Sequence, residues 1–314
     1  MSFLITENFS DKDWDYLIES SNQESFFCKS QFLKFTNNSK KFIIKQDSKI
    51  VAGTIISDTD DLNVIPFFYQ GLIISKSFLD KKEHKANKNY IDLLDSIITF
   101  LVSKFKKFNF SLHPSIKDIR PFDWYRYHEK TEKFIIKIKY TGILKTEDYL
   151  NFEDYLKNIR SVRRQEYKKK VLDYDFIEEK NIDNLDHLHD LTFKKQNKQR
   201  SEVEKKILND LIPKLIEKKI GRLISIKLKS TNKVVASSYF LHFKKNAYNL
   251  VLATDPDYRK YFFGTKILLN QIQNCFENKI EKIDFVGLNS PNRGDFKTSF
   301  NPNLTSYFEI NYSR

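Results

Sequence analysis

The stretch NAYNLVLATDPDYRKYFFGTKILLNQIQNCF, residues 246–276, decides the fold expected for this chain. Its first part, Ala247–Ala253, has the pattern of a strand. An amphipathic helix is predicted from Thr265 to about Phe276, because apolar residues then recur at helical spacing. Those residues are Leu268, Ile272, Cys275 and Phe276. Gly264 stands directly before the helix, so a strand, a basic loop and a glycine-led helix follow one another.

Further strands are expected on either side of this stretch. Leu223–Leu228 and Lys233–Phe243 have strand patterns separated by the polar turn KSTN, and a last strand is predicted at Lys282–Val286. The preceding residues predict a strand in TEKFIIKIKYTGIL, a long basic helix over 151–174, a short strand DFIEE and two helices within 181–196 and 201–219. In the last helix, Ser201 and Glu204 have the spacing of a capping box.

The first half of the chain repeats the order of hairpin, third strand, helix and strand. Its predicted elements are a helix near 10–21, strands Phe42–Lys45 and Ile50–Ser57, an apolar stretch through Ile74, a helix within 89–108 and a strand Phe108–Leu112. The segment KIVAG at 49–53 resembles KVVAS at 233–237, each after a polar turn. We therefore predict a tandem duplication of one α/β unit, with domains at 1–135 and 136–314.

Composition limits the class of protein. The 314 residues are comfortable for two domains, and the apolar share of 40% allows a sizeable core. The net charge of +13 fits an anionic partner, or a compositional bias toward Lys, Asn, Ile and Phe. The two cysteines, Cys28 and Cys275, exclude a disulfide framework and a four-cysteine zinc site. No apolar run reaches the length of a membrane span, so a soluble cytoplasmic protein is expected.

The loop before the predicted helix has the residues of a phosphate site. Backbone N–H groups at a helix start and the positive end of its dipole bind phosphate. Gly264 removes a Cβ there, Thr265 can cap the helix, and Arg259 and Lys260 add charge. The alternative is an ordinary strand-to-helix turn with solvated basic residues. The six histidines do not form a ligand set, so no metal is expected.

A three-strand meander, then Arg-x-x-x-x-Gly-Thr opening a helix, then a strand, resembles the GNAT acyltransferases. The fuller resemblance is to their FemAB-like branch, which has two tandem GNAT-like units, and it covers nearly the whole chain. It rests on the order of PFFYQGLIIS (66–75), HPSIKDIRPFDWYRY (113–127), YLKNIRSVRRQEYKKKVLDYDF (155–176), the Gly264 loop and DFVGLNSPNRGDFKTSFNPNLTSYFEI (284–310). The resemblance implies an α/β (α+β) fold, with a mostly antiparallel central sheet flanked by helices in each unit.

The resemblance also implies an activity. FemAB-like and GNAT proteins move an acyl or aminoacyl group from acyl-CoA or aminoacyl-tRNA to a primary amine. The acceptor expected here is a phosphorylated amino sugar or a lipid-linked precursor of the cell envelope. The partners are therefore that precursor, tRNA if it is the donor, and the membrane surface where a lipid-linked acceptor lies. Direct attack by the amine is expected, because no Gly-x-Ser-x-Gly, Cys–His or Walker motif appears in the sequence.

Candidate site residues follow from the same segments. By resemblance, Lys297 lies near the reacting carbonyl, and Phe296 and Phe300 would anchor it. Asp295, Asp284 or a phosphate of the substrate could take the proton, and Asn289, Ser290 and Arg293 are candidate substrate contacts. The alternative for Lys297 is a surface lysine.

The basic helix supplies a second set, Arg160, Arg163 and Arg164. By resemblance, a cation of this helix contacts the acceptor's phosphate, although a solvated helix face explains the pattern as well. The first half adds Tyr69, Gln70, His113 and Trp124, which would line a cleft between the halves or belong to the core. The rival function is a non-catalytic nucleic-acid-binding protein that uses the helix at 156–170.

Overall fold

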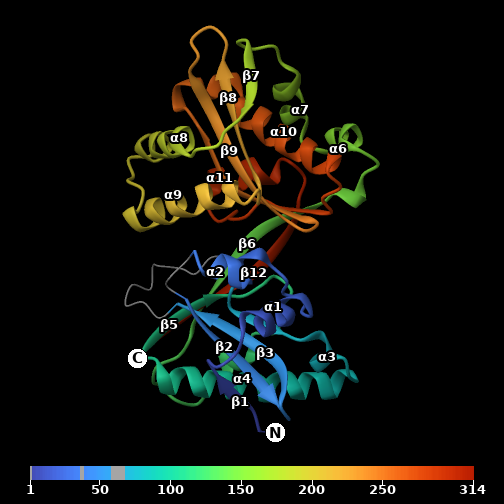
Figure 1. The fold of residues 1–314 in the computed structure, drawn as a ribbon, viewed down its shortest axis with the longest axis vertical. Helices are drawn as coiled ribbons and strands as arrows, with labels where there is room; N and C mark the ends of the chain where they lie inside the picture. The colour runs from blue at the N-terminus through green and yellow to red at the C-terminus, as the bar shows by residue number, and fades with distance from the viewer. Residues whose placement is uncertain (1, 36–38, 58–67) are drawn as a thin grey trace. The chain divides into compact units, whose positions relative to one another are not determined.

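The computed structural model describes residues 2–35, 39–57 and 68–314. They form a mixed α/β fold of two compact units (Figure 1). Unit 1 comprises Met1–Lys139 and Ser306–Arg314, and unit 2 comprises Tyr140–Thr305. This division differs from the predicted 1–135 and 136–314 mainly at the C-terminus. The reason is β12 (Asn303–Ser313), whose second half pairs with β5 (Lys107–Ser111) of unit 1.

Unit 1 contains a small antiparallel sheet in the order β1-β2-β3-β4. Its strands are β1 (Leu4–Thr6), β2 (Lys40–Gln46), β3 (Lys49–Ile56) and β4 (Leu72–Ile74). The helices are α1 (Asp11–Glu19), α2 (Ser30–Leu33), α3 (Lys76–Leu79), α4 (Glu83–Lys104) and α5 (Arg120–Trp124), with a 3₁₀ turn at Phe26–Cys28. The predicted apolar stretch before Ile74 begins within 58–67, which lies outside the described residues.

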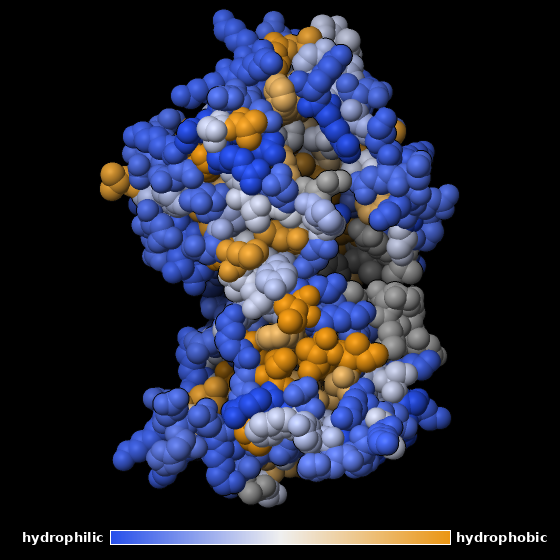
Figure 2. Space-filling view, turned by 180° about the vertical axis from the view of Figure 1, so that it is seen from behind, coloured by the Kyte–Doolittle hydropathy of each residue, from blue (hydrophilic) through white to orange (hydrophobic). Residues whose placement is uncertain are grey.

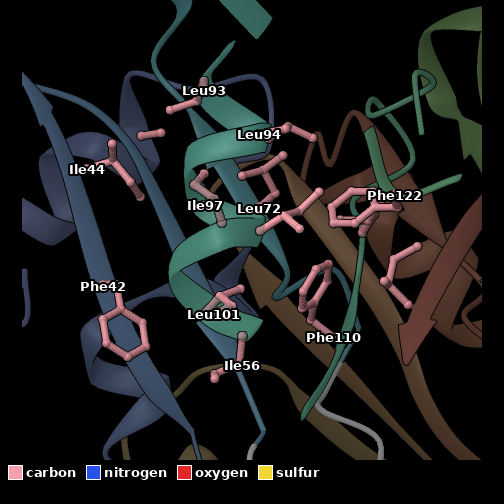
Figure 3. Packing of buried hydrophobic residues seen from close by; sticks show 14 of the residues in the cluster. Phe42, Ile44, Ile56, Leu72, Leu93, Leu94, Ile97, Leu101, Phe110 and Phe122 are labelled. Carbon is pink, nitrogen blue, oxygen red and sulfur yellow. The ribbon is translucent and has the colours of Figure 1, made fainter. Parts of the chain in front are cut away.

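Helices cover both faces of this sheet. On one face, a Cβ added to Gly53 would lie 2.8 Å from Trp14 and 2.9 Å from Leu17 of α1, so only glycine allows this close approach. On the other face, Leu93, Ile97 and Leu101 of α4 point toward the strands, with Phe42 and Ile44 opposite them (Figure 3). Ile310 and Tyr312 of β12 are buried in the same hydrophobic cluster. The last residues of the chain therefore complete the core of the first unit.

The larger sheet has eight strands in the order β5-β12-β6-β11-β10-β9-β8-β7, and unit 2 carries its part from β6 to β7. The strands of unit 2 are β6 (Ile135–Lys145, which starts in unit 1), β7 (Tyr174–Glu178), β8 (Arg222–Leu228), β9 (Val234–Phe243), β10 (Asn246–Thr254) and β11 (Lys282–Asp284). Its helices are α6 (Phe152–Asn158), α7 (Ser161–Lys168), α8 (Asp183–Lys194), α9 (Glu202–Glu217), α10 (Phe263–Glu277) and α11 (Pro291–Thr298), with 3₁₀ turns at Thr146–Asp148 and Pro256–Tyr261.

The pairing of β10 and β11 is short. These two strands are parallel and pair over three residues, ending at Tyr248 and Asp284. β10 then runs on to Thr254, whereas β11 ends and the chain turns toward α11. α10 connects the two strands and buries its apolar side against the sheet, where Leu268, Leu269 and Ile272 are fully buried. The start of α10 and the end of β11 are thereby fixed by the same packing.

One secondary-structure prediction in unit 2 is wrong. The long basic helix over 151–174 is two short helices, because Ile159 and Arg160 are extended and interrupt it. Ile159 is buried, and the N–H of Arg160 bonds the carbonyl of Ser299 instead of continuing a helix. The segment after Asn289 contains α11, which begins with Pro291 at a position that suits proline. The other predicted strands and helices of this unit are present.

Hydropathy and length give one further result. No helix in the described ranges is both long and apolar enough to cross a membrane. The surface face seen in Figure 2 is largely hydrophilic, with hydrophobic residues gathered in places between the charged ones. Exposed apolar side chains of unit 1 include Ile135 and Ile138 on β6.

The contribution of β12 to unit 1 is testable. Ile310→Ala removes a fully buried side chain, so we expect the free energy of unfolding to fall by about 2–5 kcal/mol in urea denaturation. Leu304→Ala is the matched control on the same strand, since Leu304 is 62% exposed, and should change it by at most about 0.5 kcal/mol. Equal effects of the two substitutions would contradict this role of β12.

Candidate functional site

The turn between β10 and α10 is held by a buried carboxylate. Asp255 accepts a hydrogen bond from the N–H of Asp257 (2.9 Å) and pairs with Lys233 (2.8 Å). Phe262 then adopts the left-handed conformation, with φ of 62°, and α10 begins at the next residue. The amides of Phe263 and Gly264 lie in the first turn, where helix N–H groups have no intrahelical acceptor. Arg259 and Lys260 lie exposed just before this turn.

Gly264 packs closely against neighbouring side chains and does more than allow the chain to turn. A Cβ at this position would lie 3.3 Å from Thr254 and 3.8 Å from the ring of Phe296 on α11. Thr265 is not the helix cap that the sequence predicted, because Phe262 occupies that position. The Thr265 hydroxyl is buried and donates to Oε2 of Glu166 on α7 (2.6 Å). The glycine thus brings the first turn of α10 against α11.

Lys297 lies on α11, next in sequence to Phe296. Its ammonium Nζ donates to the carbonyl of Phe285 (2.5 Å) and also to the carbonyl of Val286. The pKa of Lys297 is lowered from 10.5 to about 7, first by burial and then by the charge of Arg293, while the charge of Asp284 opposes both effects. A lysine that titrates near neutral pH, with two backbone acceptors, differs from the surface lysine of the alternative interpretation.

The turn after β11 is strained. Val286 has φ of 44° and Gly287 has φ of 66°. A β-branched residue is rare in this region, and such strain persists only where the surroundings hold it. Asp284 does so from one side, since Oδ1 accepts from the hydroxyl of Thr141 (2.5 Å) and from the N–H of Val286 (2.8 Å). Lys297 holds the carbonyl side of the same turn.

The other candidate residues of the segment 284–310 have different surroundings. The side-chain amide of Asn289 bonds the N–H (2.7 Å) and the carbonyl (3.2 Å) of Tyr140, so it fixes the backbone there. Asp295 is exposed and pairs with Arg160 (2.9 Å). Arg293 is exposed, one helical turn before Lys297.

His189 on α8 was not among the predicted site residues. Its pKa is lowered to about 4, first by burial, then by Arg200 and Arg293, with Asp190 and Asp186 opposing. Arg293 therefore acts electrostatically on both His189 and Lys297. No pattern around His189 in the sequence indicated this proximity.

The arginines near α7 are bound within unit 2. Arg163 donates to Ser299 Oγ (2.7 Å) and to Glu166 (2.7 Å), and its guanidinium lies 4.8 Å over the ring of Phe296. Arg164 donates to the carbonyls of Lys157 and Ile159, at the end of α6. Arginines with internal acceptors are less free to bind nucleic-acid phosphates, which weighs against the rival function.

The four candidates from the first half belong to unit 1. Tyr69 is buried with φ of 66°, and its ring centroid lies 5.5 Å from that of His113 and 5.4 Å from that of Tyr307. Gln70 is buried and donates to the carbonyl of Phe27 (2.6 Å). Trp124 is 47% exposed. The structure therefore groups Tyr69 with His113, whereas Gly264, Phe296 and Lys297 come together in unit 2.

No metal centre is visible in the part of the chain that the structure describes, since no three His, Cys, Asp or Glu side chains gather there as ligands would. Cys28 and Cys275 are both buried and free, and burial raises the pKa of both thiols. Neither thiol is a plausible nucleophile in that state.

A family model shows the family of this chain, and solved structures show its fold. A family model described as the FemAB family matches residues 148–308, just over half of the chain. Among curated protein sequences, none matches significantly. The matched range contains both the turn before α10 and α11.

Three solved structures illustrate the shared fold. One, described as FemX, aligns with a TM-score of 0.66 at 9% identity, covering 98% of this chain and 97% of that one. A tandem GNAT protein from the clavulanic acid biosynthesis pathway gives 0.57 at 9%, covering 99% and 98%. A GNAT-family acetyltransferase from Colwellia psychrerythraea gives 0.55 at 11%, covering 99% and 100%. These likenesses establish a tandem GNAT-like fold over nearly the whole chain.

The lowered pKa of Lys297 predicts a pH-dependent stability. Between about pH 7 and 10.5 the unfolded chain holds a proton that the native lysine has lost, so the free energy of unfolding rises with pH in that window. Lys297→Met removes this dependence. We expect the Tm of the variant minus that of the wild type to be larger near pH 6 than near pH 9.

Calorimetry at the two pH values measures this difference. Thr298→Val is the control, because Thr298 is exposed on the same helix and the substitution changes no ionisable group. A Lys297→Met difference that is the same at both pH values would refute a lowered pKa.

Proposed function

This chain belongs to the FemAB family, and from that premise we propose that it transfers an acyl or aminoacyl group to a primary amine. The coarse assignment is a transferase of the GNAT and FemAB kind. The donor we propose is an acyl-CoA or an aminoacyl-tRNA, and both carry phosphate. The acceptor we propose is the amine of an amino sugar or of a cell-envelope precursor. The family match covers both segments of the candidate site.

One observation carries the proposal, the meeting of the two predicted segments. The first turn of α10 packs at Gly264 against Phe296, which immediately precedes Lys297 on α11. A phosphate bound by the amides of that turn, with Arg259 and Lys260 beside it, would place the rest of a donor near α11. Acyl transfer requires this arrangement, with an anchor for the donor beside a cation for the reacting carbonyl.

Lys297 is suited to the carbonyl because of its hydrogen bonds. An ammonium has three N–H donors, and two of them bond the carbonyls of Phe285 and Val286. We assign the third to the oxygen that becomes negative when the amine attacks. The two backbone bonds fix the ammonium in place, so little reorganisation is needed in the transition state. The strained turn at Val286 is part of the same frame.

The proposed reaction is a direct displacement. The neutral amine nitrogen attacks the acyl carbon, a C–N bond forms, and the carbonyl electron pair moves to the oxygen near Lys297. The intermediate then collapses, and the bond to the thiol sulfur of CoA or to the ribose oxygen of tRNA breaks. The proton that the amine loses ends on that leaving group. No protein nucleophile is needed, in agreement with the absence of the covalent motifs from the sequence.

Arg293 is the best-placed cation for the acceptor. It is exposed and stands one turn from Lys297, whereas Arg163 and Arg164 have acceptors inside unit 2. An arginine fork binds phosphate in two-point fashion, as an acceptor with a phosphate group requires. We therefore assign the acceptor phosphate to Arg293. The roles first given to Asn289 and Arg160 become structural ones, holding Tyr140 and Asp295.

Thermal-shift screening tests the donor site. The wild type is tested with acetyl-CoA, CoA, aminoacyl-tRNA and nucleotide sugars, and we expect a phosphorylated donor to raise the Tm. Gly264→Glu should abolish that shift, since a carboxylate repels phosphate at the first turn of α10. Gly264→Ala is the matched control and should keep most of it, because the added Cβ makes only one tight contact, at 3.3 Å. A donor shift that survives Gly264→Glu unchanged would sink the assignment.

Turnover with the identified donor tests Lys297. Lys297→Ala should lower kcat by about 10²–10³, the usual cost of losing an oxyanion donor, with donor affinity changed only slightly. Thr298→Ala on the same helix should retain wild-type turnover. Lys297→Ala activity within a few-fold of the wild type would remove this residue from the site.

A further inference from the structure

Helix α7 is attached to unit 2 without a fully buried side chain. None of its residues, Ser161–Lys168, is buried. Tyr167 packs against the hydrophobic cluster of unit 2, and the helix also makes polar contacts, among which Glu166 is central. One carboxylate oxygen, Oε2, accepts from the hydroxyl of Thr265 on α10 (2.6 Å) and from Arg163 of α7 itself (2.7 Å). The side chains of Glu166 and Arg163 are only 12% and 15% exposed, so these charge-assisted bonds are weakly screened.

The position of Glu166 is unusual for a carboxylate near a phosphate site. Thr265 is the third residue of α10, so Glu166 lies beside the positive end of the helix, which attracts anions. A bare carboxylate there would compete with a donor phosphate for the same field. Arg163 supplies the balancing charge within the ion pair. The pair is thus close to neutral where the donor is proposed to bind.

Arg163 carries the connection on to α11. Its Nε donates to Ser299 Oγ (2.7 Å), and Ser299 in turn donates to the carbonyl of Phe296 (2.5 Å). The guanidinium also lies 4.8 Å over the Phe296 ring. Phe296 is the residue that faces Gly264 and precedes Lys297. One ion pair on α7 therefore contacts the donor turn through Thr265 and the lysine helix through Ser299 and Phe296.

We infer that Glu166 and Arg163 are positioning residues, which hold the first turn of α10 and helix α11 together and keep the donor-phosphate position free of net negative charge. The claim about the donor-phosphate position rests on the proposed function. The claim that the two residues hold α10 and α11 together does not depend on it. Neither residue contacts the reacting atoms. Each acts through another residue, Glu166 through Thr265 and Arg163 through Phe296.

The charge balance between Glu166 and Arg163 predicts how the donor KM changes from one variant to the next. Arg163→Met leaves Glu166 unpaired, so we expect the donor KM to rise by about tenfold to a hundredfold. Adding Glu166→Gln to that variant removes the repelling charge and should recover most of the loss. Thr265→Val should raise the donor KM, and Thr265→Ser should restore it because the hydroxyl is kept. The acceptor KM should stay within about twofold in all of these variants.

Gln165→Ala provides the matched control, since Gln165 is exposed on the same helix and should leave the donor KM unchanged. A purely structural role for the pair predicts that the double variant is no better than Arg163→Met alone. That result, or an equal rise of the donor and acceptor KM values, would overturn the inference.

A second measurement needs no donor. Hydrogen exchange of the ligand-free protein should be faster at residues 262–266 in Glu166→Ala and in Thr265→Val than in the wild type, with α4 of unit 1 unchanged. Unchanged exchange at 262–266 would overturn the positioning role whatever the donor is. If the wild type transfers no acyl group, the proposed function fails, and the exchange result still decides whether Glu166 holds the turn.

Discussion

The burial of α10 against its sheet is the constraint on which the arrangement of unit 2 depends. The helix connects β10 to β11, and its apolar side is fully buried through Leu268, Leu269 and Ile272. Its start is thereby fixed beside the end of β10, and its end leads into β11 after a short turn. The strained turn at Val286 and the helix α11 follow from there. The proposed site needs the first turn of α10 and Lys297 to face one region, and this packing would keep both in fixed positions.

Hydrogen bonds add to this hydrophobic packing and fix the positions of individual side chains and turns. Lys297 bonds two carbonyls of the strained turn, Asp284 bonds the N–H on its other side, and Glu166 bonds the first turn of α10. Each of these hydrogen bonds is partly or fully buried, so each constrains the positions of the groups that it joins. FemAB membership supplies the class of chemistry, and these contacts supply the reasons why these particular side chains would perform it.

Much of the fold could be predicted from periodicity and turn residues. The meander β8–β10, the helix after Gly264 and the repeated order in the first half follow from local patterns of apolar residues, which sheet and helix geometry dictate. The return of Ser306–Arg314 to unit 1 could not be predicted, because strand pairing over such a distance leaves no local signal. The break at Ile159 was missed for a similar reason. Its cause is a tertiary bond from Arg160 to Ser299, which overrides a continuous helical pattern.

The candidate site was only partly visible in the sequence. Gly264 was proposed because a glycine before a helix is a local feature, and Lys297 because its Phe-Lys-x-x-Phe element resembles that of the FemAB-like proteins. Glu166 and His189 were missed, since what distinguishes them is a partner far along the chain. The most direct test of the account is a hydrogen-exchange footprint of the bound donor. It predicts simultaneous protection of residues 262–266 and 285–297, and protection of neither segment would contradict it.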